Sequence, residues 1–106
     1  MKNLILYNGP NSPFGRKTKI VALIHDIPIE EKIIKVQESE FLDTFNPLRK
    51  IPTLVINENQ TIVDSDNICL FFDSISKKKT LFDKKNYWEI MTIISLANGL
   101  MEAGLE

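Results

Sequence analysis

The segment NLILYNGPNSPFGRKTKIVALI, residues 3–24, decides the fold of this chain. It opens with a short apolar run from Asn3 to Tyr7, which a polar turn sequence interrupts, and this pattern predicts a buried strand. Ser12 and Pro13 then predict a helix start, because serine is a favoured N-cap and proline a favoured first helical residue. The segment therefore predicts a strand that turns directly into a helix ending near Asp26.

The rest of the chain extends this unit into a larger sheet. A strand that follows such a helix normally returns parallel to the first strand through a right-handed crossover. A polar loop at Asn57–Gln60 separates two β segments and predicts a hairpin. The sequence predicts strands at Ile29–Val36, Thr53–Ile56 and Thr61–Val63, a short helix or turn at Glu38–Phe45, and a helix from residues 64–66 to Ile75. The expected fold class is α/β, with a mixed four-stranded sheet in the order βαβ–ββα.

A long final helix is expected from Asp83 to about Glu102. Apolar residues go nearly all the way round it, and a helix of this kind belongs inside a larger bundle. One domain of this length cannot cover it, so further helices or a second subunit are expected to do so, and both options stay open. The apolar residues are Tyr87, Trp88, Ile90, Met91, Ile93, Ile94, Leu96, Ala97, Leu100 and Met101.

The composition argues against several classes of protein. The chain has 106 residues, 43% hydrophobic and 25% charged, as in one ordinary globular domain. Its net charge of −1 gives no electrostatic case for binding nucleic acid. A single cysteine and a single histidine argue against a metal site and exclude an internal disulfide. No apolar run approaches the roughly 20 residues of a membrane span, and no signal peptide is recognisable, so a cytoplasmic protein without a membrane partner is expected.

Three segments together resemble one protein family. Leu6–Lys17 carries a Ser-Pro-aromatic-x-Arg-Lys pattern, Asn46–Leu54 carries Asn-Pro followed by Ile-Pro-Thr-Leu, and an acid–serine pair stands at Asp64-Ser65. Their order and spacing resemble those of bacterial, serine-type glutathione S-transferases. The resemblance implies a thioredoxin-like glutathione-binding domain over residues 1–77, a linker over 78–83 and, over 84–106, the first helix of an all-helical domain that is otherwise missing.

The resemblance implies that the Ser12 hydroxyl donates a hydrogen bond to the sulfur of glutathione. A free thiol has a pKa of about 8.5 and is mostly protonated at neutral pH. The amino end of a helix presents unpaired N–H groups and partial positive charge, which favour the thiolate. Two alternatives stay open: Ser12 is only a helix cap, or Tyr7 contacts the sulfur, as a tyrosine does in other classes of the family.

The resemblance also implies how the rest of glutathione is held. A cis Ile51–Pro52 bond would turn the Ile51 backbone toward the cysteinyl part, which pairs with it like an added strand. Ser65 would bind the α-carboxylate of the γ-glutamyl end, and Asp64 its α-ammonium, although aspartate reaches less far than the glutamate or glutamine more usual there. The alternatives are an ordinary loop or edge proline and an acid–serine pair that only caps a helix.

Other side chains are less specific candidates. Lys50, with Arg49 close behind, would bind the glycine carboxylate, and the alternative is two solvated loop cations. Arg16 and Lys17 lie early in a helix, against the helix dipole, which indicates a nearby anion or carboxylate unless the side chains are simply solvated. Cys69 is expected to be a buried structural thiol. His25 suits the end of its helix and is assigned no chemistry.

The implied function is that of a glutathione transferase, in which the thiolate of bound glutathione attacks a small electrophilic substrate without a metal. A role in detoxification and a homodimer are expected with it. The chain alone is expected to be weakly active or inactive, because helices that it lacks line part of the electrophile pocket. The alternative is a non-catalytic regulatory or protein-binding module of the same fold. Thiol–disulfide exchange would need a cysteine where Ser12 stands.

Overall fold

The computed structural model describes residues 4–10, 12–35, 40–41 and 50–105. The order of its elements confirms the α/β class predicted from the sequence. The elements are β1 (Leu4–Asn8), α1 (Pro13–Ile24), β2 (Ile29–Ile33), β3 (Thr53–Asn57), β4 (Gln60–Val63), α2 (Ser65–Ile75), the 3-10 turn η3 (Lys84–Asn86) and α3 (Tyr87–Leu105). The helix or turn expected at Glu38–Phe45 lies mostly outside the described residues.

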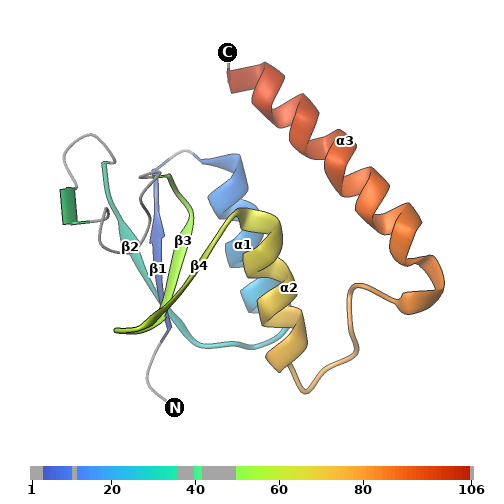
Figure 1. The fold of residues 1–106 in the computed structure, drawn as a ribbon, viewed down its shortest axis with the longest axis horizontal. Helices are drawn as coiled ribbons and strands as arrows, with labels where there is room; N and C mark the ends of the chain where they lie inside the picture. Colours follow the sequence, from blue (N-terminus) through green and yellow to red (C-terminus); the bar gives the residue numbers. More distant parts are fainter. Residues whose placement is uncertain (1–3, 11, 36–39, 42–49, 106) are drawn as a thin grey trace.

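The four strands form one mixed sheet in the order β2-β1-β3-β4. As the crossover predicts, β1 and β2 are parallel, whereas β3 is antiparallel to both β1 and β4. Helices α1 and α2 lie side by side on one face of the sheet, and α3 lies beyond them, away from the sheet (Figure 1). The molecule thus has three layers: the sheet, a helix pair, and one outer helix.

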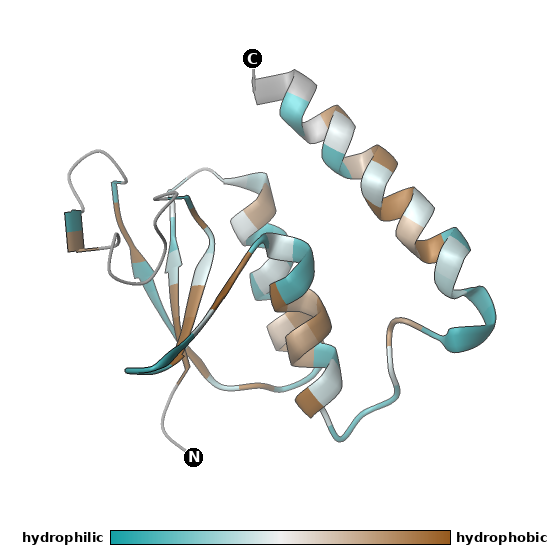
Figure 2. Ribbon diagram, viewed as in Figure 1, coloured by the Kyte–Doolittle hydropathy of each residue, from teal (hydrophilic) through white to brown (hydrophobic). Residues whose placement is uncertain are grey.

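Alternate residues of a strand face opposite sides of a sheet. One of these two sets faces α1 and α2, and the main core lies between the sheet and this helix pair. It consists of Leu4, Leu6, Ala22, Leu54, Ile68 and Phe72. The residues between them in β1 and β3 face the other side, where Tyr7 and Val55 form a smaller cluster. The apolar residues of β1 and β3 belong to these two clusters, as do Ile68, Phe71 and Phe72 of α2, whereas α3 carries apolar residues apart from the sheet (Figure 2).

Helix α3 keeps much of its apolar surface in contact with solvent, as the sequence predicts. Trp88, Ile93, Leu96 and Leu100 are between 65% and 79% exposed. On α1, Ile20, Leu23 and Ile24 are also exposed, in a pattern that places them on one side of the helix. In the parts of the chain that are described, no helix combines the length and apolar content needed to cross a membrane.

Two predicted boundaries are wrong, each for a local reason. Strand β2 stops at Ile33 rather than Val36, because its neighbour β1 ends at Asn8, whose carbonyl accepts the last hydrogen bond, from the Ile34 N–H at 2.8 Å. The final α-helix starts at Tyr87 rather than Asp83. The Asp83 carboxylate caps the 3-10 turn η3 instead, by accepting from the Lys85 N–H at 3.0 Å.

One carboxylate fastens the segment that joins α2 to η3. Asp73 of α2 accepts hydrogen bonds from the Leu81 N–H at 2.7 Å, from the Thr80 hydroxyl, and from His25 Nε2 at 3.0 Å. His25 caps α1 and its side chain is fully buried. Asp73 therefore joins the ends of both helices to the linking segment.

Candidate functional site

The topology brings three separate segments to one end of the sheet. Thr53, the first residue of β3, pairs with Tyr7 of β1 on one side and with Val63 of β4 on the other. Since β3 is antiparallel to both neighbours, the segment after β1, the segment before β3 and the segment after β4 meet at that end. It is the end at which α1 begins (Figure 1). The three segments are the ones that carry the family resemblance.

Ser12 caps α1, as the sequence predicts. Its backbone is extended, and its Oγ accepts a hydrogen bond from the Gly15 N–H at 3.1 Å. The Ser12 carbonyl accepts the first helical hydrogen bond, from the Arg16 N–H at 3.0 Å. A serine hydroxyl that accepts in this way still has its own hydrogen to donate. The cap and a contact with a sulfur atom are therefore compatible with each other.

The turn after β1 and the segment before β3 are in close contact. The Ile51–Pro52 peptide bond is cis, the isomer that the resemblance implies, and Pro52 is buried. A Cβ on Gly9 would lie only 2.3 Å from Ile51 Cδ1 and 3.9 Å from the Ser12 Cβ. Glycine at this position therefore lets Ile51 approach the backbone beside Ser12.

The Asp64–Ser65 pair starts α2. The Asp64 carboxylate accepts from the Asp66 N–H at 2.9 Å, and Ser65 is 6% exposed. Asp64 has φ 77° and ψ 125°. Such a positive φ is uncommon for a residue other than glycine, and backbones of this kind gather at ligand-binding sites. Because the carboxylate itself is exposed, it remains accessible to a cation from solvent.

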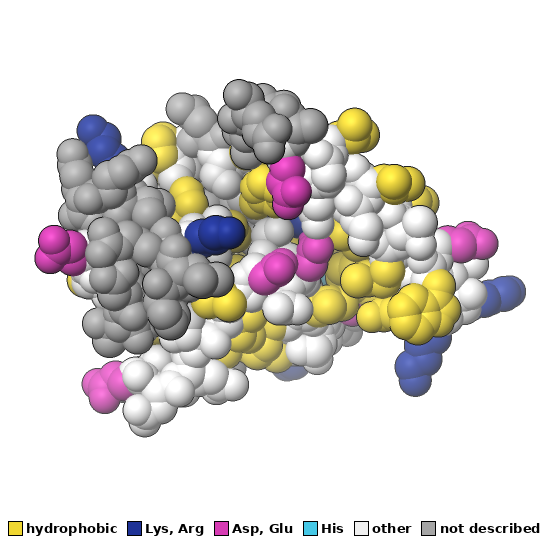
Figure 3. All heavy atoms as spheres, turned by 45° about the horizontal axis from the view of Figure 1, so that its top comes forward, with side chains coloured by type: hydrophobic (Ala, Val, Ile, Leu, Met, Phe, Trp, Pro, Cys, Tyr) yellow, Lys and Arg dark blue, Asp and Glu magenta, His cyan; other side chains and the backbone are white. Residues whose placement is uncertain are grey.

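Of the two basic candidates, Lys50 and Arg49, the structure describes Lys50. Lys50 is exposed, and its carbonyl accepts a hydrogen bond from the Thr53 hydroxyl at 2.7 Å, which fixes its backbone at the same end of the sheet. Arg49 lies outside the described residues. Seen from the end where the segments meet, the surface carries acidic side chains beside a basic one near its middle, with apolar residues toward α3 (Figure 3).

Tyr7, the alternative partner for the sulfur, belongs to the cluster on the far face of the sheet. Its ring packs with Val55 there and lies 5.2 Å from the ring of Phe41. It is 9% exposed. This position favours a structural role for the Tyr7 ring, on the opposite face of the sheet from α1 and α2.

Cys69 is a buried structural thiol, as predicted. It is 3% exposed, and burial raises the pKa of the thiol to about 11. A thiol that stays protonated at neutral pH is a poor nucleophile. Among the described residues, no group of three or more acidic, histidine or cysteine side chains could hold a metal ion.

The sequence did not reveal the part that Asn8 plays beneath the α1 N-terminus. Asn8 is 3% exposed, and its Nδ2 donates to the Glu31 carboxylate at 3.1 Å. Its Oδ1 faces Gly15, where a Cβ would lie 1.6 Å away. The side chain thus fills the space under the first turn of α1. The only available signal was a glycine inside a predicted helix, which often marks a close contact.

Comparisons with known proteins agree with these features. Residues 6–80 match the family model "Glutathione S-transferase, N-terminal domain". The chain is 31% identical over 97 residues to the uncharacterized GST-like protein YibF of Escherichia coli (strain K12). That alignment covers 89% of this chain and 48% of YibF, so the chain spans about half the length of this curated relative.

Solved structures share the fold. A glutathione S-transferase from Methylobacillus flagellatus KT with GSH bound has a TM-score of 0.89 and 24% identity, over 97% of this chain and 52% of its own. A glutathione transferase family member from Pseudomonas fluorescens Pf-5 with bound glutathione has a TM-score of 0.84 and 27% identity, over 97% of this chain and 54% of its own. These likenesses confirm the thioredoxin-like architecture expected from the sequence.

Proposed function

The chain belongs to the glutathione S-transferase family, and from this premise we propose that it binds glutathione at the end of the sheet where Ser12, Ile51 and Ser65 lie, and stabilises the thiolate of the bound tripeptide. One observation carries the proposal: the half-buried Ser12 hydroxyl caps α1, has a hydrogen left to donate, and lies beside Ile51. The helix end and the hydroxyl both favour negative charge at the sulfur.

The remaining contacts follow from the same placement. The Ile51 backbone pairs with the cysteinyl part of glutathione, as an added strand would. Ser65, at the N-terminus of α2, binds the α-carboxylate of the γ-glutamyl residue, and the exposed Asp64 carboxylate accepts from its α-ammonium. Lys50, or its neighbour Arg49, binds the glycine carboxylate.

The reaction that we propose needs no protein nucleophile. The glutathione thiolate donates an electron pair to an electrophilic carbon, a carbon–sulfur bond forms, and the leaving group departs with its own electron pair. The protein binds, orients and ionises the thiol. This chain spans about half of its curated relative. We therefore propose for the whole protein, and not for this chain alone, that it uses a small electrophilic substrate, lies in the cytoplasm and forms a homodimer.

The same proposal divides the chain into a glutathione-binding domain at 1–77, a linker at 78–83 and a helix of a second domain at 84–106. The family match ends at residue 80, which supports that division.

Ser12→Ala will raise the pKa of the bound glutathione thiol by about one unit, because one charge-assisted hydrogen bond to the thiolate accounts for about 1.4 kcal/mol. The measurement is a pH titration of thiolate absorbance in the saturated complex, after the affinity has been determined by calorimetry. Loss of the cap lowers stability by about 1 kcal/mol, which a denaturation curve reports separately. Ser12→Thr keeps the hydroxyl and is the control; an unchanged thiol pKa in the alanine variant would overturn the assignment.

Asp64→Asn will weaken glutathione binding about tenfold while stability changes by less than about 0.5 kcal/mol. Asparagine tolerates the positive φ and keeps an oxygen for the Asp66 N–H, so the variant removes the charge alone. A calorimetric titration measures the affinity. Asp66→Asn, two residues away, is no suitable control, because Asp66 pairs with Lys17. Exposed Glu58→Gln serves instead, and equal affinities for all three proteins would remove Asp64 from the site.

A second candidate function, a protein-binding module, is favoured by the exposed apolar residues of α3, such as Trp88 at 79% exposure. Patches of this kind mark interaction surfaces on many proteins. The two functions differ in one measurement. Calorimetry that detects no glutathione binding by the full-length protein would favour the module over the enzyme.

A further inference from the structure

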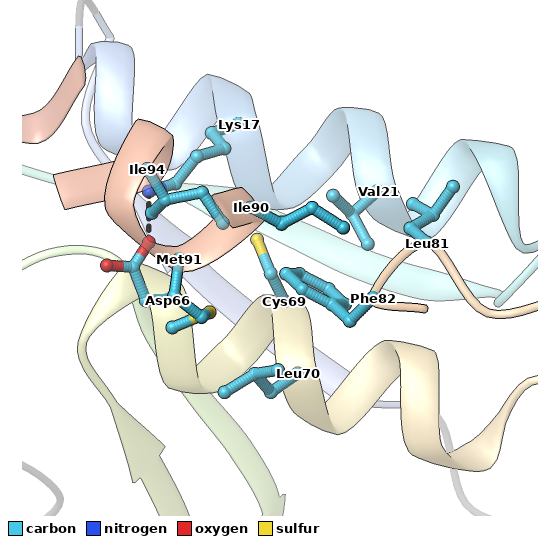
Figure 4. A pocket seen from close by; sticks show the side chains of 10 residues that line it. All are labelled: Lys17, Val21, Asp66, Cys69, Leu70, Leu81, Phe82, Ile90, Met91 and Ile94. Carbon is cyan, nitrogen blue, oxygen red and sulfur yellow. Dashed lines mark hydrogen bonds and ion pairs between the residues drawn. The ribbon is translucent and has the colours of Figure 1, made fainter. Parts of the chain in front are cut away.

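A cavity of about 260 Å³ lies between α1, α2, α3 and the segment that precedes η3 (Figure 4). Most of the side chains that line it are apolar. They include Val21 of α1, Leu70 of α2, Phe82 of the linking segment, and Ile90, Met91 and Ile94 of α3. None of the residues assigned above to glutathione is among those that line it, so the cavity is separate from the proposed thiol site.

The two charged residues that line the cavity neutralise each other at one end of it. Lys17 Nζ lies 2.5 Å from Asp66 Oδ1 and donates to Asn98 Oδ1 at 3.0 Å, while Asn98 Nδ2 donates to Asp66 Oδ2 at 2.6 Å. The carboxylate expected near Lys17 is therefore Asp66. Lys17, Asp66 and Asn98 thus already pair with one another. An ion that entered the cavity would lose its hydration without gaining an unpaired polar partner from these three side chains.

The same hydrogen bonds fix the walls of the cavity. Asn98 ties α3 to Lys17 of α1 and Asp66 of α2, above the apolar walls. On the other side, Asp73 accepts from the backbone N–H of Leu81, which lines the cavity beside Phe82. The two contacts hold α3 and the linking segment against the helix pair, so the cavity exists before any ligand enters.

Its volume and its lining together select a class of ligand. The cavity is open to solvent on one side, where Leu81 is 40% exposed. Because its walls are mostly apolar, water inside it finds few hydrogen-bond partners, and an apolar ligand that displaces this water gains free energy. A cavity of about 260 Å³ has room for an apolar molecule larger than benzene. We propose that this cavity binds a small, uncharged, apolar compound of about two fused rings.

The test is a titration of the 106-residue chain with prodan, an uncharged naphthalene derivative whose emission shifts to the blue in apolar surroundings. Saturable binding of one probe per chain is expected. Ile94→Trp fills the cavity from α3 and will weaken binding about tenfold or more. Ile93→Trp is the matched control, because Ile93 is 65% exposed and is not among the lining residues. Its affinity will stay like that of the wild type.

Cys69 provides an independent readout in the unmodified chain, because it is the single cysteine and its sulfur faces the cavity (Figure 4). Bound prodan will slow the reaction of this thiol with 4,4′-dithiodipyridine, whereas prodan on the exposed faces of α1 or α3 will not. Unsaturable binding, equal losses in both tryptophan variants, or an unchanged thiol reaction rate at saturating probe would overturn the proposal. None of these outcomes depends on glutathione.

Discussion

Gly15→Ala will lower the free energy of unfolding by about 3 kcal/mol, although glycine-to-alanine changes inside helices usually raise it by about 1 kcal/mol. The new Cβ would lie 1.6 Å from Asn8 Oδ1 and 2.4 Å from its Cγ. The Asn8 amide cannot easily turn aside, because it is buried and donates to the Glu31 carboxylate. The first turn of α1 or strand β1 must move instead. Denaturant unfolding, followed by circular dichroism, measures the difference.

Gly99→Ala is the matched control for this effect. Gly99 also lies inside a helix, but nothing is within 4 Å of the position that its Cβ would take. The same substitution should therefore raise stability by up to about 1 kcal/mol there. The two glycines thus predict changes of opposite sign. If Gly15→Ala were also stabilising, the contact with Asn8 would not constrain the helix.

The clash also bears on the proposed function. The Gly15 N–H is the donor to the Ser12 Oγ at 3.1 Å, so a displaced first turn moves the hydroxyl that would face the sulfur. The Asn8→Ala, Gly15→Ala double variant removes the clash. It should recover part of the lost stability relative to the sum of the single changes, as expected for two residues in direct contact.

Features with a local signal in the chain could be predicted from the sequence. The Ser12-Pro13 pair sets the start of α1 through a hydrogen bond that spans three residues. Strands β3 and β4 follow from β-rich runs on either side of a polar loop. The cis bond before Pro52 was accessible only through the family resemblance, since an isolated X-Pro bond is cis in only about 5% of cases. The helix start at residues 64–66 had a local signal, but its interpretation as part of a ligand site came from the resemblance.

Contacts between residues far apart in the sequence could not be predicted. His25 looked like an ordinary residue at a helix end, yet it meets Asp73, 48 positions along the chain. Asn98 lies 81 positions from Lys17. Neither contact can be read from the spacing of residues along a helix or a strand, because each depends on how two helices pack against each other. The sequence indicated a carboxylate near Lys17 but not which one.

Asp73→Ala will lower the free energy of unfolding by about 3 kcal/mol, because it removes an ionised acceptor shared by three donors. Most of the loss arises at His25. Its side chain is fully buried, and its Nδ1 has no hydrogen-bond partner among the described residues. Without Asp73, Nε2 would be left unsatisfied as well. Thr80 and Leu81 are exposed and regain hydrogen bonds from water. Thermal and denaturant unfolding measure the loss.

Asp73→Asn separates the charge from the hydrogen-bond geometry. The Thr80 hydroxyl can rotate to accept from the new amide, while His25 and Leu81 still donate to the remaining oxygen. A smaller loss, about 1.5 kcal/mol, is therefore expected. Asp26→Asn is the control: its carboxylate pairs with Lys78 at 2.6 Å but is 73% exposed, so the change should be below about 0.5 kcal/mol. Equal effects at Asp73 and Asp26 would contradict the role given to Asp73.

The pH dependence of stability tests the same carboxylate in the wild-type protein. Burial alone would raise the pKa of Asp73, but hydrogen bonds from Thr80, Leu81 and His25 outweigh it and hold the pKa below the ordinary value of 3.8. A carboxyl group whose pKa is lower in the folded than in the unfolded state binds more protons when unfolded. Its stabilising effect is therefore complete above about pH 4 and is lost as the pH falls further, through the folded-state pKa.

The measurement is the difference in the free energy of unfolding between wild type and Asp73→Asn at a series of pH values. This difference should stay constant from neutral pH down to about 4 and shrink below it. Protonation at low pH removes from the wild type the charge that the variant already lacks. A difference that persisted unchanged at lower pH would mean that the charge of Asp73 is not what holds the linking segment to α1 and α2.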